Sequence, residues 1–178
     1  MIKVLVVEDD PMVSKLHEVY INQLDGFKLA NTCKNSEEAL EYLTTQRVDL
    51  VILDVFMPGK DGMELLQDIR SQGINVDIIM ISAANDKERI VKALRLGVFD
   101  YIIKPFEFER FSIALNNYKQ RYLICRKEGA LTQTELDYSL LNRSKNITGK
   151  IPKGLEKSTL DKVWQEIDTL DGNVTIEI

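Results

Sequence analysis

The sequence predicts an α/β protein with a doubly wound parallel sheet, and three observations support that prediction. Short apolar runs of strand length alternate five times with helical patterns, at about 20 to 25 residues per strand–helix unit. The runs are rich in Val, Ile and Leu and rarely alternate with polar residues, as expected of strands that are covered on both faces. Right-handed crossovers between parallel strands then place helices on both faces of the sheet.

The five expected strands share an apolar, β-branched composition, and each one ends in polar or turn-forming residues. They are placed at 2–7, 27–33, 49–53, 77–81 and 100–103. The expected helices follow residues that favour a helix start or end before glycine. They are placed at 11–24, from the N-cap Ser36 onward, at 61–72, at 86–96 and after Phe106.

In the first helix, apolar residues recur at spacings of three and four, which predicts that they form its buried face. They are Met12, Leu16, Val19, Tyr20 and Leu24. The single histidine, His17, lies on the same helix. No serine or cysteine accompanies it in a catalytic pattern, so we assign it a structural role, solvated or half-buried.

Acidic residues stand at the ends of two strands. Glu8, Asp9 and Asp10 follow the first strand, and Asp54 ends the third. In the flavodoxin-like strand order 2-1-3-4-5, these two strands are neighbours, about 4.8 Å apart. Since ligands bind at the carboxyl edge of such sheets, we expect the carboxylates of Glu8, Asp9 and Asp54 to converge there.

Three convergent carboxylates repel one another unless a cation compensates their charge. No His or Cys accompanies Glu8, Asp9 and Asp54, and an all-oxygen ligand set favours Mg²⁺. Mg²⁺ typically joins one or two carboxylates to a phosphate oxygen, and an aspartate beside it can attack phosphorus. The sequence therefore predicts a Mg²⁺ site at which Asp54 can become an aspartyl phosphate.

Two further strand ends carry groups suited to a phosphoryl oxygen. Ser82, at the end of the fourth strand, offers a hydroxyl donor, and Lys104, after the fifth, offers a flexible cation. Singly, an N-capping serine and a surface lysine explain them as well, but their placement at consecutive strand ends favours the pocket. The Lys104–Pro105 bond is also a candidate cis peptide.

These residues form part of a series that runs in order along residues 1–120. The series is Glu8-Asp9, Asp54 with Met57-Pro58 and Asp61-Gly62 after it, Ser82-Ala83, Tyr101 and Lys104-Pro105-Phe106. It resembles the receiver domain of bacterial two-component response regulators. The resemblance implies that Asp54 accepts a phosphoryl group from a sensor histidine kinase, and that the protein is no enzyme beyond Mg²⁺-dependent self-phosphorylation and self-dephosphorylation.

The resemblance also assigns the metal ligands. Asp9 and Asp54 would hold Mg²⁺ together with the backbone carbonyl of Phe56, and Glu8 would act through water. Asp10 falls outside this set. Phe56 is large and apolar for its position, and we expect it to limit the access of water and so to slow hydrolysis of the phosphoryl group.

Lys104 and Ser82 would bind the phosphoryl oxygens in such a domain. The Ser82 hydroxyl would move toward the phosphoryl group, and Tyr101 would turn inward to fill the space that it leaves. That movement would reshape the face made by the fourth helix, fifth strand and fifth helix. The alternative for Tyr101 is an ordinary half-buried tyrosine.

The composition fits a packed protein: of 178 residues, 44% are hydrophobic and 29% are charged. No apolar stretch approaches the roughly 18 residues that a membrane helix needs, and the strand-like start leaves no room for a signal peptide. We therefore expect a cytoplasmic protein with no membrane partner. Cys33 and Cys125 fit no metal or redox spacing and are expected to be free thiols.

Charge is unevenly distributed along the chain. Residues 1–120 carry 14 basic and 19 acidic side chains, residues 121–157 carry 8 and 4, and residues 158–178 carry 1 and 5. The first part is therefore no nucleic-acid binder by charge alone. We divide the chain into a receiver domain at 1–120, a helical and basic linker at 121–157, and the start of an output domain at 158–178.

The fifth helix carries an apolar stripe that runs past the expected end of a receiver domain. Its members are Phe108, Phe111, Leu115, Tyr118, Tyr122 and Cys125. The first half is expected to pack on the sheet, and the second, with Lys119, Arg121, Arg126 and Lys127, to overshoot as a connecting helix or a dimer seam. A homodimer through the fourth helix, fifth strand and fifth helix is also left open.

The residues after the fifth helix predict two further helices. Residues 132–135 read as a capping box, with Leu131 and Leu136 as a hydrophobic staple, and predict a short helix to about residue 141. A basic loop at 142–157 follows, and Ser158 caps an amphipathic helix.

Three of these later segments resemble the citrate/malate, or C4-dicarboxylate, class of response regulators. They are residues 132–137, 151–155 and 159–160. In that class such a region opens a helix-turn-helix output domain, which implies transcriptional control of carboxylic acid uptake or metabolism genes. This chain ends at Ile178, before the recognition helix of that class. We interpret the end as a truncation, with a natural short form as the alternative, and expect little or no binding to promoter DNA.

Three other functions fit the sequence less well. A stand-alone phosphorelay shuttle leaves the residues after 130 without a role. A hydrolase that forms an aspartyl phosphate would need an aspartate two residues after Asp54, where Phe56 stands. A flavin-binding protein would need a phosphate-cradling loop after the first strand, where Glu8, Asp9 and Asp10 would repel phosphate.

Overall fold

The computed structural model describes residues 1–83 and 86–135. They contain one five-stranded parallel sheet with the strand order β2-β1-β3-β4-β5. Its strands are β1 (Ile2–Val7), β2 (Phe27–Cys33), β3 (Leu50–Asp54), β4 (Asp77–Ser82) and β5 (Asp100–Ile103). The predicted flavodoxin-like order is confirmed, and Asp54 and Ser82 are the last residues of their strands.

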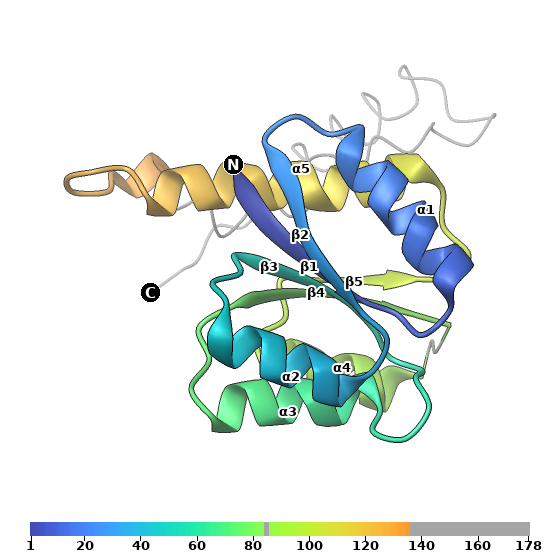
Figure 1. The fold of residues 1–178 in the computed structure, drawn as a ribbon. Helices are drawn as coiled ribbons and strands as arrows, with labels where there is room; N and C mark the ends of the chain where they lie inside the picture. The colour runs from blue at the N-terminus through green and yellow to red at the C-terminus, as the bar shows by residue number, and fades with distance from the viewer. Residues whose placement is uncertain (84–85, 136–178) are drawn as a thin grey trace, which may run out of the picture. The chain divides into compact units, whose positions relative to one another are not determined.

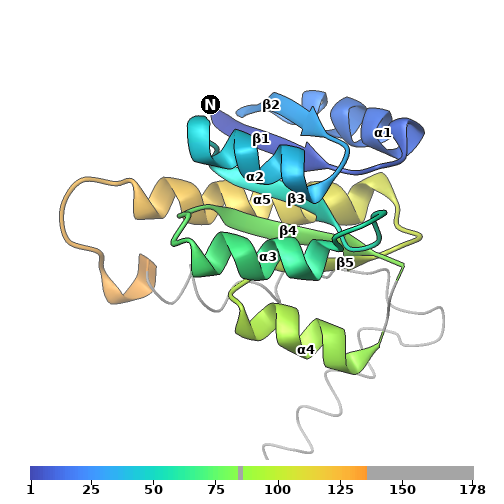
Figure 2. The same ribbon diagram turned by 60° about the horizontal axis from the view of Figure 1, so that its bottom comes forward.

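Helices cover both faces of the sheet, as right-handed crossovers require. They are α1 (Pro11–Asn22), α2 (Ser36–Thr45), α3 (Gly62–Ser71), α4 (Lys87–Arg95) and α5 (Phe108–Cys125). Figure 1 shows α1 and α5 on one face and α2, α3 and α4 on the other, and Figure 2 shows the same layers after a turn. Each face has its own buried apolar cluster, so the sheet is covered on both sides.

Aspartate or asparagine side chains start the first four helices. Asp10, Asn35, Asp61 and Asp86 each accept hydrogen bonds from backbone N–H groups of the first turn of the helix that follows. The prediction that Ser36 is an N-cap is wrong. Ser36 is buried, and its hydroxyl instead donates to the carbonyl of Lys60 at 2.8 Å.

The predicted buried face of α1 is also largely wrong. Met12, Leu16 and Val19 are among the exposed apolar residues, whereas His17 and Ile21 are buried. The His17 ring lies nearly parallel to the rings of Phe106 and Phe111, with centroids 6.1 and 5.8 Å away. Burial, followed by the charge of Lys104, lowers the pKa of His17 to about 4. His17 is therefore a neutral aromatic core residue and is neither solvated nor half-buried.

The second half of α5 binds the amino-terminal edge of the sheet more extensively than the sequence predicts. The Tyr118 hydroxyl donates to the backbone oxygen of Asp49 at 2.7 Å, and the Tyr122 hydroxyl donates to Oδ1 of Asp49 at 3.0 Å. Arg126 lies 3.8 Å from the same carboxylate, and Arg121 donates to Asp77 at 3.2 Å. This half of the helix is therefore anchored to the residues that begin β3 and β4.

The predicted capping box after α5 is confirmed. The backbone N–H of Thr132 donates to Glu135 at 2.9 Å, and the backbone N–H of Glu135 donates to the Thr132 hydroxyl at 3.3 Å. The expected features beyond residue 135, including Leu136, the basic loop and the output helix, lie outside the described residues. The division at residues 120 and 157 therefore stays a prediction.

Both cysteines are free thiols, as expected. Cys33 is buried, and burial followed by the charge of Glu38 raises the pKa of its thiol to about 11. Cys125, at the end of α5, is exposed. Across the described residues, no helix combines the length and the apolar character needed to cross a bilayer.

Candidate functional site

The carboxyl edge of the sheet brings the three predicted acidic residues together. Val7 pairs with Leu53, so the residues that follow, Glu8 and Asp54, come from adjacent strand ends. One carboxylate oxygen from each of Glu8, Asp9 and Asp54 lies within 4.8 Å of the other two. Glu8 and Asp54 are buried, whereas Asp9 reaches solvent. Asp10 stays out of the cluster, because its side chain caps α1.

Lys104 provides the positive charge next to this cluster. Its Nζ lies 3.0 Å from Oε2 of Glu8 and 3.2 Å from Oδ1 of Asp54. The Lys104–Pro105 peptide is cis, as anticipated from the sequence. One ammonium group therefore contacts two buried carboxylates, and the third carboxylate has no such partner within the described residues.

The pKa shifts in the cluster follow from burial and crowding. Burial, then the neighbouring charge of Asp54, raises the pKa of Glu8. Burial also raises the pKa of Asp54, and the ammonium of Lys104 only partly opposes the shift. Burial alone would lower the pKa of Lys104, but the charges of Asp54 and Glu8 outweigh it and raise that pKa. The site therefore favours a further cation over more negative charge.

The donor set fits a hard divalent cation. All three side chains offer carboxylate oxygens, which Mg²⁺ prefers. Oδ1 of Asp54 is buried, and Lys104, which lies 3.2 Å away, is shared between this oxygen and Glu8. A buried carboxylate oxygen without a donor of its own is costly unless a cation or water satisfies it. The acidic cluster is therefore compatible with Mg²⁺.

Ser82 ends β4, the strand beside β3, and Tyr101 lies on β5, one strand further from Asp54. Ser82 is fully buried, and it directly follows Ile81, the partner of Asp54 in the sheet. The backbone N–H of Lys104 donates to the carbonyl of Ser82 at 2.7 Å, which brings the two strand ends together. Tyr101 is half-buried and packs against the apolar cluster under α2, α3 and α4. The strand ends thus bring Ser82 and Lys104 to the edge that carries Asp54.

The loop between β3 and α3 packs closely against Asp54. The backbone N–H of Gly62 donates to the carbonyl of Val55 at 2.9 Å, and a Cβ on Gly62 would lie 2.1 Å from the backbone oxygen of Asp54. The sequence predicts Gly62 at the start of the third helix but gives no sign of this contact. Arg89 of α4, which the sequence did not single out, also reaches this loop, with its Cζ 5.5 Å from the ring centroid of Phe56. A contact between residues 33 positions apart leaves no local sequence signal.

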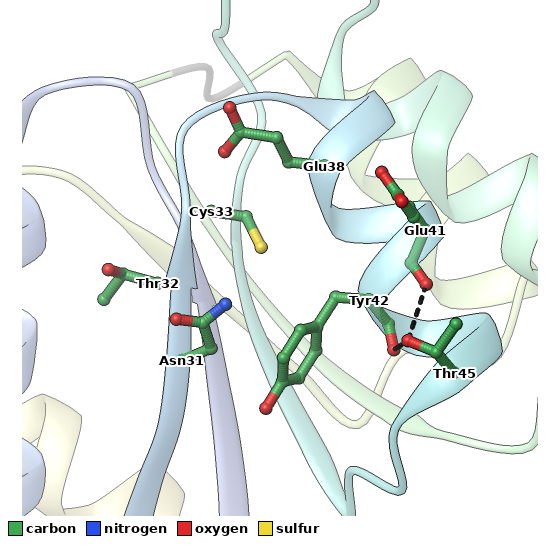
Figure 3. Close-up of a pocket in the computed structure, with 7 residues that line it drawn as sticks. All are labelled: Asn31, Thr32, Cys33, Glu38, Glu41, Tyr42 and Thr45. Carbon is green, nitrogen blue, oxygen red and sulfur yellow. Dashed lines mark hydrogen bonds between the residues drawn. The ribbon is translucent and has the colours of Figure 1, made fainter.

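Two hollows lie near the edge strand β2. One, of about 200 Å³, borders the acidic cluster and includes Glu8 and Cys33 in its wall. The other, of about 270 Å³, lies between β2 and α2, and Figure 3 shows the side chains that line it. The hydrogen bonds drawn there run from the Thr45 hydroxyl to the carbonyls of Glu41 and Tyr42, within α2. They serve the end of that helix, and none of the predicted site residues lines this second hollow.

Comparisons with known proteins agree with this geometry. Residues 4–116 match the family described as response regulator receiver domain. The chain is 46% identical over 173 residues to transcriptional regulatory protein MalR of Bacillus subtilis, covering 96% of this chain and 73% of MalR. It is 39% identical over 172 residues to the probable C4-dicarboxylate response regulator DctR of Halalkalibacterium halodurans, covering 96% and 75%.

A solved structure shows the same fold. The chain superposes on one from the CheX-CheY-BeF3-Mg complex of Borrelia burgdorferi with a TM-score of 0.61 and 28% identity, over 66% of this chain and 89% of the other. A five-stranded parallel sheet with an acidic cluster and a lysine at its carboxyl edge is the arrangement of a receiver fold. The chain belongs to the response regulator receiver family.

The chain is, more narrowly, a two-component response regulator related to the citrate/malate and C4-dicarboxylate class, as its sequence indicated. The match to transcriptional regulators extends over nearly all of this chain, beyond the receiver at residues 4–116. A stand-alone phosphorelay shuttle is therefore not favoured.

Proposed function

We propose that this protein accepts a phosphoryl group on Asp54 from the phosphohistidine of a sensor histidine kinase and thereby controls transcription. The observation that carries the proposal is the contact of one ammonium, that of Lys104, with both Glu8 and Asp54 inside a cluster of three carboxylates. In a cluster with only a structural role, we would expect basic side chains to pair with all the carboxylates and balance their charge. Here a net negative charge remains at the edge where this family binds its ligands.

In the transfer step, an oxygen of Asp54 attacks phosphorus, and the bond from phosphorus to the histidine nitrogen breaks. The electron pair of that bond leaves with the imidazole, and Asp54 carries the phosphoryl group as a mixed anhydride. Lys104 is close enough to turn from Glu8 and Asp54 to the new phosphoryl oxygens. Ser82 would donate its hydroxyl to another of these oxygens.

Glu8, Asp9 and Asp54 are the side chains that would hold Mg²⁺, with the Phe56 carbonyl as a backbone ligand and Glu8 acting through water. When bound, Mg²⁺ would neutralise charge on the transferring phosphoryl group. The rise in the pKa of Glu8 and Asp54 from burial and crowding supports this assignment, because a bound cation relieves both.

Movements of Ser82 and Tyr101 would couple phosphorylation of Asp54 to a change at the protein surface. Once Ser82 turns toward the phosphoryl group, Tyr101 would pack inward and change the surface made by α4, β5 and α5. The half-buried position of Tyr101 above an apolar cluster supports this movement. That surface, or the anchored second half of α5, would form a homodimer contact.

The names of the relatives MalR and DctR support the remaining assignments. The protein would bind promoter DNA of genes for carboxylic acid uptake or metabolism. It would act in the cytoplasm, without a membrane partner and without turning over a separate substrate.

Labelling by acetyl phosphate tests the proposal. The chain should take up one acid-labile phosphoryl group in the presence of Mg²⁺ and none in EDTA, as measured by intact mass. D54N should abolish the label. D49N is the matched control, since Asp49 lies just before the same strand, and it should label like the wild type. A labelled D54N variant, or an unlabelled wild type, would refute the proposal.

A further inference from the structure

Arg89, in the first turn of α4, contacts both ends of the loop that follows the acceptor strand. Its Cζ lies 5.5 Å from the ring centroid of Phe56, near the start of the loop. Its Nη1 lies 3.8 Å from Oδ2 of Asp61, which caps α3 at the end of the loop. Its Nε lies 3.6 Å from Oδ2 of Asp86, the cap of its own helix. One guanidinium thus connects α4 to the loop beside the site.

These contacts hold an aromatic ring that has little other support. The Phe56 residue is 48% exposed, so packing alone leaves its ring free to move. A guanidinium over an exposed ring contributes about 0.5 to 1 kcal/mol, enough to favour one ring position several-fold. Nη1 of Arg89 is itself buried and donates no hydrogen bond to the described residues, so its contacts on this side are the Phe56 ring and, at 3.8 Å, the Asp61 carboxylate.

Phe56 lies near the acceptor. The strand ladder continues past Asp54, because the backbone N–H of Val55 donates to the carbonyl of Ile81 at 3.1 Å. The strand ends at Asp54, and Phe56 stands two residues later, in the loop that begins at this edge of the sheet. Val55 is fully buried, whereas Phe56 returns to the surface at the edge where Asp54 ends β3. The aromatic ring offers no hydrogen bond that would orient a water molecule for attack.

We propose that Arg89 is a positioning residue that holds the Phe56 ring beside Asp54 and so slows the hydrolysis of the phosphoryl group. This inference rests on the proposed phosphorylation of Asp54. In hydrolysis a water oxygen attacks phosphorus, the bond from phosphorus to the Asp54 oxygen breaks, and the carboxylate and inorganic phosphate are released. The proton of the water passes to the phosphate. A ring held in place restricts the approach of that water, and a released ring restricts it less.

The test is the decay rate of the phosphorylated 178-residue chain after removal of acetyl phosphate. R89Q should decay about 2- to 5-fold faster than the wild type, since a contact of about 0.5 to 1 kcal/mol corresponds to such a factor, and its phosphorylation rate should be unchanged. R89K retains the charge but loses the planar group, and its decay rate should lie between those of the wild type and R89Q. R95Q alters an exposed arginine on the same helix and should decay like the wild type.

A double-mutant cycle separates positioning from a general effect on α4. In an F56A background, R89Q should change the decay rate by less than about twofold, because the ring that Arg89 holds is gone. Equal effects of R89Q in both backgrounds, or no effect in either, would overturn the inference and leave Asp54 phosphorylation intact. A wild type that takes up no label would overturn the proposed function, and this inference with it.

Discussion

An aspartate lies at each end of β3, and the two differ in how many donors and cations surround their carboxylates. Asp49, just before β3, receives the backbone N–H of Lys3 and the hydroxyl of Tyr122, and Arg126 lies 3.8 Å away. Asp54, at the other end, shares the ammonium of Lys104 with Glu8 and has a further carboxylate, that of Asp9, beside it.

The difference shows what separates a structural carboxylate from one that is a candidate for phosphorylation. Both residues are buried or nearly so: the Asp49 side chain is 11% exposed and that of Asp54 is 6% exposed. Asp49 has enough donors to balance its charge, whereas burial and crowding raise the pKa of Asp54. An aspartate at a strand end is therefore a candidate site only where its charge remains unbalanced.

The largest expected effect comes from crowding the acceptor end. G62A should lower the free energy of unfolding by about 3 kcal/mol, since the new Cβ meets the backbone of Asp54, which cannot move without breaking the sheet. It should also reduce labelling at Asp54. Urea unfolding measures the first effect and intact mass the second. The control G59N introduces a side chain into open space and should cost less than about 1 kcal/mol. Equal losses in both variants would refute the contact.

Acid titration separates His17 from the carboxylates. The unfolded chain protonates its histidine near pH 6.5, whereas the folded state keeps His17 neutral to about pH 4. Stability is therefore lost as the pH falls through this window, by about 3 kcal/mol at pH 4.

H17F removes that loss, because phenylalanine keeps an aromatic ring beside Phe106 and Phe111 without a titrating group. Urea midpoints between pH 4 and 7 measure the change. The raised pKa values of Glu8 and Asp54 act in the opposite direction, since the folded state then binds protons more readily than the unfolded chain. H17F should therefore level or reverse the slope. An unchanged slope would show that His17 does not cause it.

The direct test of the comparison is the paired substitution of both aspartates. D49N should lower the free energy of unfolding by about 1.5 kcal/mol, because the amide replaces an acceptor of charged and hydroxyl donors. Urea unfolding at pH 7 provides the measurement. A neutral or stabilising D49N would mean that the contacts of Tyr122 and Arg126 with Asp49 contribute nothing.

D54N should have the opposite sign and the smallest size, a gain of about 1 kcal/mol, because it removes a buried charge whose pKa is raised. Added Mg²⁺ should stabilise the wild type and have little effect on D54N, since ligand binding to the folded state raises its stability. Thermal unfolding with Mg²⁺ and with EDTA measures both. A D54N variant less stable than D49N would break the distinction between the two ends.

The parts of the fold that depend on short-range pattern were predictable. Strand composition predicts all five strands to within one residue at their ends, and the predicted strand order correctly brings Glu8, Asp9 and Asp54 together. Both results depend on local chemistry and on a topology that few alternatives satisfy.

The features that depend on packing between elements far apart in the chain were not predictable. Helix α1 has a continuous apolar stripe through Met12, Leu16 and Val19, yet the sheet covers His17 and Ile21 instead. Periodicity identifies an amphipathic helix, but it counts histidine as polar. It therefore cannot show that the buried face of α1 is the adjacent one, which contains a neutral His17. The contacts of Asp49 with Tyr122, and of Arg89 with Phe56, join residues far apart in the chain.

The two cysteines provide this protein with an internal reporter. The Cys33 thiol is buried and stays protonated at neutral pH, while Cys125 is exposed on the last residue of α5. A maleimide fluorophore or a nitroxide spin label would therefore attach at one place in the natural sequence. Cys125 lies three residues beyond Tyr122, which binds Asp49 at the amino-terminal end of β3, whereas Asp54 is at the carboxyl end of that strand. The mobility of the attached probe would report whether phosphorylation at one end of β3 loosens the helix that is anchored at the other.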